Sequence, residues 1–385
     1  MARALYIHWP FCLKKCPYCD FNSHVRASVD HSVWLAAMLA DMRHEAELAA
    51  GEKLESIFFG GGTPSLMPPA LVGALLDEAD RLWGFDPDIE ITLEGNPSSV
   101  EAANYAALAS AGVNRVSLGL QSLDDAALKF LGRLHDAQEG LEALEIAQKQ
   151  FRRVGFDLIY ALPDQTAGQW QAQLERALGF GTGHLSLYQL TIEPGTRFAT
   201  DVRQGGFTPL DDDAAADLFN LTRELTTSAG LPAYEISNHA RPGEESRHNL
   251  TYWRYHDYVG IGPGAHGRRG GLATLRHRKP ENWLSAIEQQ GHGLAQEIRL
   301  AAREQAAEAL LMGLRLAEGI DIEALGDRLN IPTRQLIRED KLAFTHQQGL
   351  TWQNGPRIGV TELGMPLLDA LLPLVVPDEL VATTP

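Results

Sequence analysis

The feature of this sequence that most restricts its fold is a regular alternation of short β-rich runs with amphipathic helical stretches. Helical periodicity occurs near residues 30–50, 69–83, 99–111, 136–149 and 167–179. Strands that alternate with helices predict βαβ units and a parallel sheet. We therefore expect an α/β protein in which residues 1–205 form a partial (β/α)6 barrel. The six β-rich runs span residues 3–9, 55–60, 89–94, 115–121, 153–160 and 184–191.

Beyond residue 205 the alternation gives way to other patterns. A helix is expected at 211–229, because the preceding TPLDDD segment supplies acidic residues that suit a helix N-terminus. Residues 237–280 are rich in glycine, histidine, arginine and aromatic residues, which indicates irregular structure. Residues 206–300 as a whole are expected to complete the barrel and to connect it onward. Residues 301–385 show helical patterns and a strand pair near 349–360, which predicts a mainly helical, winged-helix-like C-terminal domain.

The charge balance bears on what such a domain can bind. The chain has 385 residues, with 33 Lys plus Arg, 50 Asp plus Glu and a net charge of −17. No broad basic face is then available for phosphate groups, so we expect no nucleic-acid partner. A structural or partner-docking lid is the role that we expect for the C-terminal domain. A small anionic ligand held by one or two arginines is still compatible with this charge.

The sequence also predicts a location. Residues 1–11 carry a single lysine or arginine and no long apolar run of the kind found in signal peptides. No stretch approaches the apolar length that spans a bilayer, so no integral membrane segment is expected. The three cysteines lie too close together for structural disulfides, which favours a reducing compartment. We expect a cytoplasmic protein.

All the cysteines of the chain lie in one segment, CLKKCPYCDF, at Cys12, Cys16 and Cys19. Thiolates bind zinc or iron–sulfur clusters. A structural zinc ion needs a fourth ligand, which His8 or His24 could supply. A c-type haem site needs a histidine after the last cysteine, and an aspartate stands there instead. Three thiolates also fit three irons of a four-iron cube, and the fourth iron is then open to substrate.

Polar groups stand at the ends of the later β-rich runs as well. The carboxyl ends of barrel strands surround one mouth, so we expect these groups to converge with the cysteine segment. They are the GGGTP turn at 60–64, with Gly61, Gly62 and Thr63, then Glu94, Gln121, Arg133 just beyond it, Asp157 and Thr191.

Each of these groups has an expected role. The glycine turn permits close approach of a ligand, although a tight turn between strand and helix explains it nearly as well. A branched side chain at Gly62 is expected to fill ligand space and to spare the cysteines. Asp157 stands among apolar residues and must be paired. Arg133 is the candidate partner, unless both residues bind a ligand. Tyr6 either faces the mouth or packs.

Together these motifs resemble the radical S-adenosylmethionine superfamily. CLKKCPYC and GGGTP carry the resemblance, and LEGNP, SLGLQS, LGRLH and DLIYALPDQT extend it to the branch of oxygen-independent coproporphyrinogen III dehydrogenase and the haem chaperone HemW. The resemblance covers nearly the whole chain. It implies a [4Fe-4S] cluster on the three cysteines, with S-adenosylmethionine at the open iron. By motif position it implies further contacts with S-adenosylmethionine from Tyr6, Gly61, Gly62, Thr63, Glu94, Gln121, Arg133 and Asp157.

Three features resemble the chaperones more than the dehydrogenase. Phe21 stands where the dehydrogenase has a fourth cysteine, and the long extension that precedes the first strand of that enzyme has no counterpart before Tyr6. The segment HNLTYW matches the HNxxYW signature of the chaperones. There, His248 is expected to bind haem iron as a neutral imidazole, with His256 as the alternative. Tyr252 and the tryptophan beside it offer flat apolar surface for a macrocycle. The segment follows the barrel strands, so we expect haem to sit beside the cluster mouth without displacing S-adenosylmethionine.

The resemblance implies a haem chaperone that hands haem to an acceptor protein. It also implies an electron donor of the flavodoxin or ferredoxin type, or NADH. The alternatives are the dehydrogenase reaction on coproporphyrinogen III and a radical reaction on an unrelated substrate, so enzymatic activity is left open. The number of S-adenosylmethionine molecules, one or two, is also open. A cluster with one open iron could bridge two subunits, so a homodimer is left open too.

Overall fold

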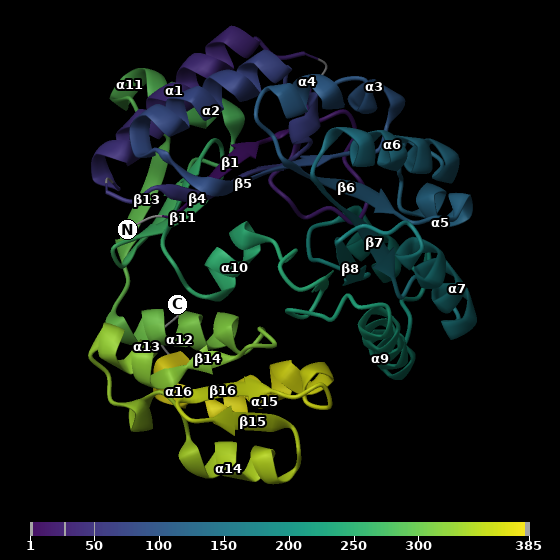
Figure 1. Ribbon diagram of the computed structural model, residues 1–385, viewed down its shortest axis with the longest axis vertical. Coiled ribbons are helices and arrows are strands. Elements are labelled where there is room, and N and C mark those ends of the chain that lie inside the picture. The colour runs from purple at the N-terminus through teal and green to yellow at the C-terminus, as the bar shows by residue number, and fades with distance from the viewer. Residues whose placement is uncertain (1–2, 27, 50, 382–385) are drawn as a thin grey trace.

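The computed structural model describes residues 3–26, 28–49 and 51–381. Its main feature is a large curved sheet of 11 strands in the order β13-β12-β11-β10-β1-β4-β5-β6-β7-β8-β9 (Figure 1). The six central strands run parallel, which confirms the predicted partial (β/α)6 barrel. They are β1 (Ala4–Trp9), β4 (Leu54–Gly61), β5 (Phe85–Gly95), β6 (Arg115–Gln121), β7 (Arg153–Tyr160) and β8 (His184–Gln189).

Alternation along these strands separates an apolar outer face from a polar inner face. Ile57, Leu93 and Leu118 are buried in the core beneath the helices. Glu94 and Ser117 are register partners on β5 and β6 and point to the inside. The convex face is covered by α1 (His31–Leu48), α2 (Pro69–Trp83), α3 (Ser99–Ala102), α4 (Tyr105–Ser110), α5 (Asp125–Phe130), α6 (Ala137–Gln150) and α7 (Ala167–Leu178), followed along the chain by α8 (Arg197–Arg203) and α9 (Asp212–Ser228).

Local sequence signals explain several helix boundaries. The Asp30 side chain accepts hydrogen bonds from the backbone N–H groups of Ser32 and Val33 at the start of α1. Thr166 and Gln169 form a capping box at the start of α7. The single helix expected at 99–111 is divided into α3 and α4 by a short turn.

The segment at 237–280, expected to be irregular, is instead largely regular, so that expectation was wrong. Its strand β10 pairs in parallel with β1, and β11 to β13 continue the sheet as an antiparallel meander. The Arg276 guanidinium on β12 is buried against Asp41 (2.7 Å) and Glu45 (2.8 Å) of α1. The added elements are β9 (Asn238–Ala240), α10 (Arg247–Trp253), β10 (Tyr258–Ile261), β11 (His266–Arg269), β12 (Leu272–Arg276), α11 (Pro280–Gln290) and β13 (Leu294–Arg299).

The C-terminal part is mainly helical, as predicted, and its expected strand pair is joined by a third strand. Its apolar core also includes Phe219 and Tyr255 from the preceding part of the chain. Helix α10 lies between this part and the concave face of the sheet, and contacts both β4 and α12 (Figure 1). Among the helices of the described residues, none is long and apolar enough to cross a membrane. The elements are α12 (Ala302–Gly313), β14 (Ile320–Asp321), α13 (Ile322–Leu329), α14 (Glu339–Gln347), β15 (Thr351–Asn354), β16 (Arg357–Val360), α15 (Leu368–Val375) and α16 (Asp378–Val381).

Candidate functional site

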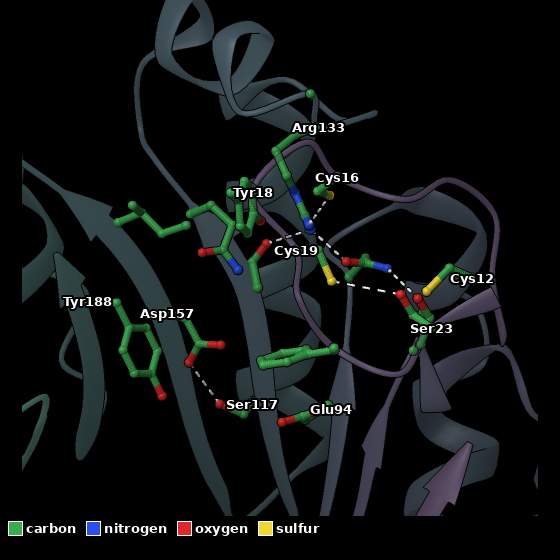
Figure 2. A pocket seen from close by; sticks show the side chains of 18 of the residues that line it. Cys12, Cys16, Tyr18, Cys19, Ser23, Glu94, Ser117, Arg133, Asp157 and Tyr188 are labelled. Atoms are coloured by element: carbon green, nitrogen blue, oxygen red, sulfur yellow. Dashed lines mark hydrogen bonds between the residues drawn. The ribbon is translucent and has the colours of Figure 1, made fainter. Parts of the chain in front are cut away.

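A cavity of about 870 Å³ opens where the parallel strands end (Figure 2). Its wall contains both the cysteine loop and the polar strand ends, so the predicted convergence occurs in the structure. Thr191 also lines it, although β8 ends two residues earlier, at Gln189. Ten of the predicted site residues line it: Cys12, Cys16, Cys19, Gly61, Gly62, Thr63, Glu94, Gln121, Arg133 and Asp157.

The cysteine loop is closed by a short parallel ladder. Strand β2 (Phe11–Cys12) pairs with β3 (His24–Val25), so Cys12 sits opposite Val25 at the base of the loop. Cys12 is buried, whereas Cys16 and Cys19 are half-buried, and all three are free thiols. The Cys16 sulfur accepts a hydrogen bond from Arg133 (3.5 Å), and the Cys19 sulfur lies 3.7 Å from the Ser23 hydroxyl (Figure 2). Three thiols therefore face one cavity from a single loop.

His8 lies beside this loop and does not offer a free ligand atom. One ring nitrogen, Nε2, donates to the Asn22 carbonyl oxygen (2.9 Å), so the other, Nδ1, accepts from the Tyr6 hydroxyl (2.9 Å). Burial lowers the pKa of His8 to about 4, which keeps the ring neutral. His8 is therefore committed on both nitrogens, and the zinc alternative loses one of its two proposed fourth ligands.

The glycine turn at the end of β4 packs against the cysteine loop. A Cβ atom on Gly61 would lie 2.6 Å from His8, and its φ of 114° is one that residues with side chains rarely adopt. The Gly62 N–H donates to the Trp9 carbonyl (2.7 Å) and the Thr63 N–H donates to the Phe11 carbonyl (2.9 Å). Both amides are therefore used to hold the loop. The turn therefore positions the cysteines as well as bordering the cavity.

Two carboxyl groups lie on the inner wall of the barrel. The Ser117 hydroxyl donates to Asp157 (3.2 Å), and Glu94 stands beside Ser117 in the sheet register (Figure 2). Burial, with repulsion from Asp157, raises the pKa of Glu94 to about 8. Burial raises the pKa of Asp157 to about 6, although hydrogen bonds from Ser186 and Ser117 oppose the change. A cation bound beside these two carboxyl groups would favour their ionised forms and so lower their pKa values.

Gln121 and Arg133 complete the rim. Gln121 ends β6 with a φ of 68°, a left-handed conformation that non-glycine residues adopt at a cost. Arg133 lies in the turn between α5 and α6, where its guanidinium donates to Asn96 Oδ1 (2.5 Å) and to the Gly119 carbonyl (2.9 Å). The expected pair with Asp157 is not formed, because these acceptors hold the guanidinium.

Tyr6 and His248 are the two predicted site residues that do not line the cavity. His248 is 1% exposed, and its ring nitrogens hydrogen-bond the Ser56 and Tyr252 hydroxyls (3.1 and 2.5 Å). Ser56 stands five residues before Gly61 on β4, which corresponds to ~16 Å of strand. His248 therefore lies inside the barrel, below the mouth. Burial lowers the pKa of His248 to about 3.

Several cavity residues were missed by the sequence reasoning. Asn96 follows Glu94 in the LEGNP segment and bridges Arg133 and Thr63. Ser117 could have been found from strand alternation, because it stands four residues before Gln121 and so shares its face. The others in Figure 2 come from loops or from the last strand, where no local signal marks them: Tyr18, Ser23 and Tyr188.

The chain matches two protein-family models and is similar in sequence to several known proteins. The model of the Radical SAM superfamily matches residues 6–177, and that of the HemN C-terminal domain matches residues 300–367. The chain is 42% identical over 326 residues to "Radical S-adenosyl methionine domain-containing protein 1, mitochondrial" of Bos taurus, covering 82% of this chain and 74% of that protein. It is 40% identical over 324 residues to "Heme chaperone HemW" of Escherichia coli strain K12, covering 82% of this chain and 83% of that protein.

A solved structure gives the corresponding result for the fold. The coproporphyrinogen III oxidase HemN from Escherichia coli, described as a radical SAM enzyme, superposes with a TM-score of 0.80. The match covers 96% of this chain and 88% of that one, at 22% sequence identity. At this identity the likeness concerns the fold alone.

Proposed function

Because the chain belongs to the radical S-adenosylmethionine superfamily, in the branch of the haem chaperone HemW, we propose that it is a haem chaperone. It would bind a [4Fe-4S] cluster, S-adenosylmethionine and haem, and deliver haem to an acceptor protein. The membership rests on 40% identity across 83% of the Escherichia coli relative. That relative is named as a haem chaperone, which supports haem as the cargo.

The observation that carries the proposal is the set of three free thiols on one cavity wall. Cys12, Cys16 and Cys19 are the residues that would hold the cluster. When bound, the cluster would supply an iron with an open coordination site and one-electron chemistry. Arg133 donates a hydrogen bond to the Cys16 sulfur and so helps to fix its position. Three thiols in one cavity, without a fourth, fit such a cluster by the chemistry of their donors.

S-adenosylmethionine would occupy the same cavity. Its ammonium and sulfonium groups carry positive charge, which Glu94 and Asp157 are placed to attract. Gly61 and Gly62 border this cavity and let the turn pack closely against the cysteine loop, because neither has a side chain. Gln121 and the remaining rim groups would then orient the ligand. Tyr6 acts indirectly in this arrangement, through its hydrogen bond to His8.

Haem needs an iron ligand, for which His248 and His256 are the two proposed residues. The ring of His248 can reach iron only if α10 moves, because both ring nitrogens are hydrogen-bonded in the barrel interior. His256 lies on the exposed surface and needs no such movement. In the observed conformation His256 is the accessible residue, although it does not line the cavity, and His248 becomes accessible when α10 is displaced.

The second candidate function is decarboxylation of coproporphyrinogen III. The residue Phe21 disfavours this second function, because it occupies the position where that enzyme has a cysteine. Its side chain is 62% exposed. We therefore expect the anaerobically reconstituted protein to take up haem and to convert no coproporphyrinogen III at enzyme-like rates. Haem uptake is followed by the Soret band, and porphyrinogen turnover by product analysis under reducing conditions. Turnover to protoporphyrinogen IX at ~1 s⁻¹ or faster would overturn the chaperone proposal.

The partners of the proposed chaperone are a haem-accepting protein and an electron donor, either of the flavodoxin or ferredoxin type or NADH. The open iron also permits a homodimer bridged through the cluster. A cytoplasmic location belongs to the same proposal, because clustered free thiols persist in reducing compartments.

A further inference from the structure

The cavity extends from the cysteine loop to the C-terminal part of the chain. Arg315 follows α12 and Asp369 lies in α15, and both contribute to its wall. Phe219 of α9 and Ile236 line the same side. The volume of about 870 Å³ lies near the upper end of the ~300–1,000 Å³ typical of small-molecule sites. The cavity therefore has a second side, built from different elements, that the cluster and S-adenosylmethionine contacts leave unassigned.

Arg315 on this side of the cavity has no acceptor, and neither does Arg223 of α9, which does not itself line the cavity. The Nε atom of Arg315, and the Nε and Nη1 atoms of Arg223, are buried and have no hydrogen-bond partner. Every other arginine of residues 3–26, 28–49 and 51–381 is either exposed or has a guanidinium that makes a hydrogen bond or an ion pair. The chain has 50 acidic and only 33 basic residues, so carboxylates are in excess over cations. Two half-buried guanidinium groups without a carboxylate partner are therefore unexpected.

The HNLTYW segment holds one of these arginines in place. The Arg315 guanidinium lies over the Trp253 ring, with 4.9 Å between its central carbon and the ring centroid. The Trp253 Nε1 is buried as well, and within the described residues it has no acceptor. Arg223 lies in the same way over Phe219, at 5.5 Å. Stacking fixes the plane of a guanidinium while its N–H donors remain available.

The chemistry of this side matches a carboxylate carried by a large apolar ligand. A planar guanidinium pairs with a carboxylate through two parallel N–H···O bonds. Besides Asp369, this side supplies apolar and aromatic surface from Phe219, Ile236, Leu187 and Tyr188. A flat ring with acidic side arms would bury its face here and give the Arg315 guanidinium the partner that it lacks.

We propose that Arg315, held by Trp253, binds a carboxylate of the ligand in this cavity. The proposal rests on the haem chaperone function, under which the carboxylate is a haem propionate. It gives the HNLTYW segment a role through its tryptophan, as the support of Arg315, in addition to any role of its histidine.

The test is a haem titration of the full-length, anaerobically reconstituted protein, followed by the Soret band. Arg315→Gln removes the charge, and its haem affinity should fall ~10–100-fold, as expected for a buried charge-assisted pair. Arg303→Gln is the matched control, because Arg303 lies exposed on the preceding helix and should leave affinity unchanged. Iron content and far-ultraviolet circular dichroism establish that both variants fold.

The second measurement replaces haem with haem dimethyl ester, whose propionates are neutral. Wild-type protein should prefer haem to the ester by a similar factor, and Arg315→Gln should lose that preference. Equal affinity of wild type and Arg315→Gln for haem, with no preference over the ester, overturns the Arg315 proposal alone. A wild type that binds no haem overturns the chaperone function and this inference with it. Equal weakening of S-adenosylmethionine binding would assign the carboxylate to that ligand and also overturn the inference.

Discussion

Gly62 lies at the end of β4 in a place with no room for a side chain. A Cβ atom there would lie 2.6 Å from the Phe11 carbonyl oxygen and 2.8 Å from the Pro10 carbonyl carbon. Both are backbone atoms at the start of the cysteine loop, so they cannot rotate away as the end of a flexible side chain can. Gly62→Ala therefore has to displace the strand that carries Cys12. The effect of even one methyl group is expected to reach the cysteines, contrary to the expectation that they are spared.

The size of the effect follows from these contacts. Overpacking of a close-packed site costs ~1–3 kcal/mol, and contacts with backbone at 2.6–2.8 Å favour the upper part of that range. We expect Gly62→Ala to lower the thermal midpoint of unfolding and to reduce iron and sulfide incorporation after anaerobic reconstitution. Differential scanning calorimetry measures the first quantity, and colorimetric iron and sulfide assays measure the second.

Gly73→Ala is the matched control for this substitution. Gly73 lies inside α2, and a Cβ atom there would meet Ala111 at 3.7 Å, an ordinary contact. The change should stabilise the helix by up to ~1 kcal/mol and leave cluster content unchanged. If Gly62→Ala shows the midpoint and iron content of wild type, the packing argument fails. The loop would then tolerate a shift that the contacts forbid.

Three further predictions concern the cavity and the proposed haem ligands. Replacement of any one of the three cysteines by alanine should abolish the cluster, whereas stoichiometric zinc without iron or sulfide in the wild type would refute that assignment. The pKa of Glu94 is raised from 4.5 to about 8, so the native chain holds more protons than the unfolded chain, and stability should fall as pH rises through that interval. Glu94→Gln should flatten this dependence and raise the thermal midpoint at pH 8, and unchanged pH profiles would contradict it. For haem iron, His256→Ala should alter the Soret spectrum if α10 keeps its place, and His248→Ala should do so if it moves; identical spectra in both variants would exclude both residues as ligands.

The parallel part of the fold could be predicted because each strand carries its own signal. The strands of the antiparallel extension do not. The strands β10 and β11 span four residues each, and their conformation depends on pairing with neighbours rather than on local composition. A Cβ atom on Gly260 would lie 1.9 Å from the His266 carbonyl oxygen, so this glycine serves close strand pairing. From sequence alone, the same glycines indicate loops.

The site could be predicted in composition but not in depth. Alternation tells which residues face the inside of the barrel, and Tyr6 does so in register with Phe58. It does not tell how far each lies from the mouth, because inward residues two apart on a strand differ by ~7 Å in height. Tyr6, Phe58 and Thr92 lie at one height in the sheet, and Glu94 lies two residues further along β5, so it reaches the cavity. Tyr6 therefore lies about one such step deeper than Glu94. The His248 ring is at the same depth, with its centroid 6.2 Å from that of Tyr6.

The raised pKa values of Glu94 and Asp157 mean that carboxyl groups on the inner wall of the cavity can hold protons that a bound cation would release. A cation that comes to rest beside Glu94 favours the ionised carboxylate and sends its proton into solvent. Uptake of such a cation is then matched by acidification of the medium, in proportion to occupancy. Affinity for the cation increases as the pH rises toward about 8, where Glu94 gives up its proton unaided. A ligand without positive charge binds without releasing this proton, so proton release into the medium distinguishes a cationic ligand from a neutral or anionic one.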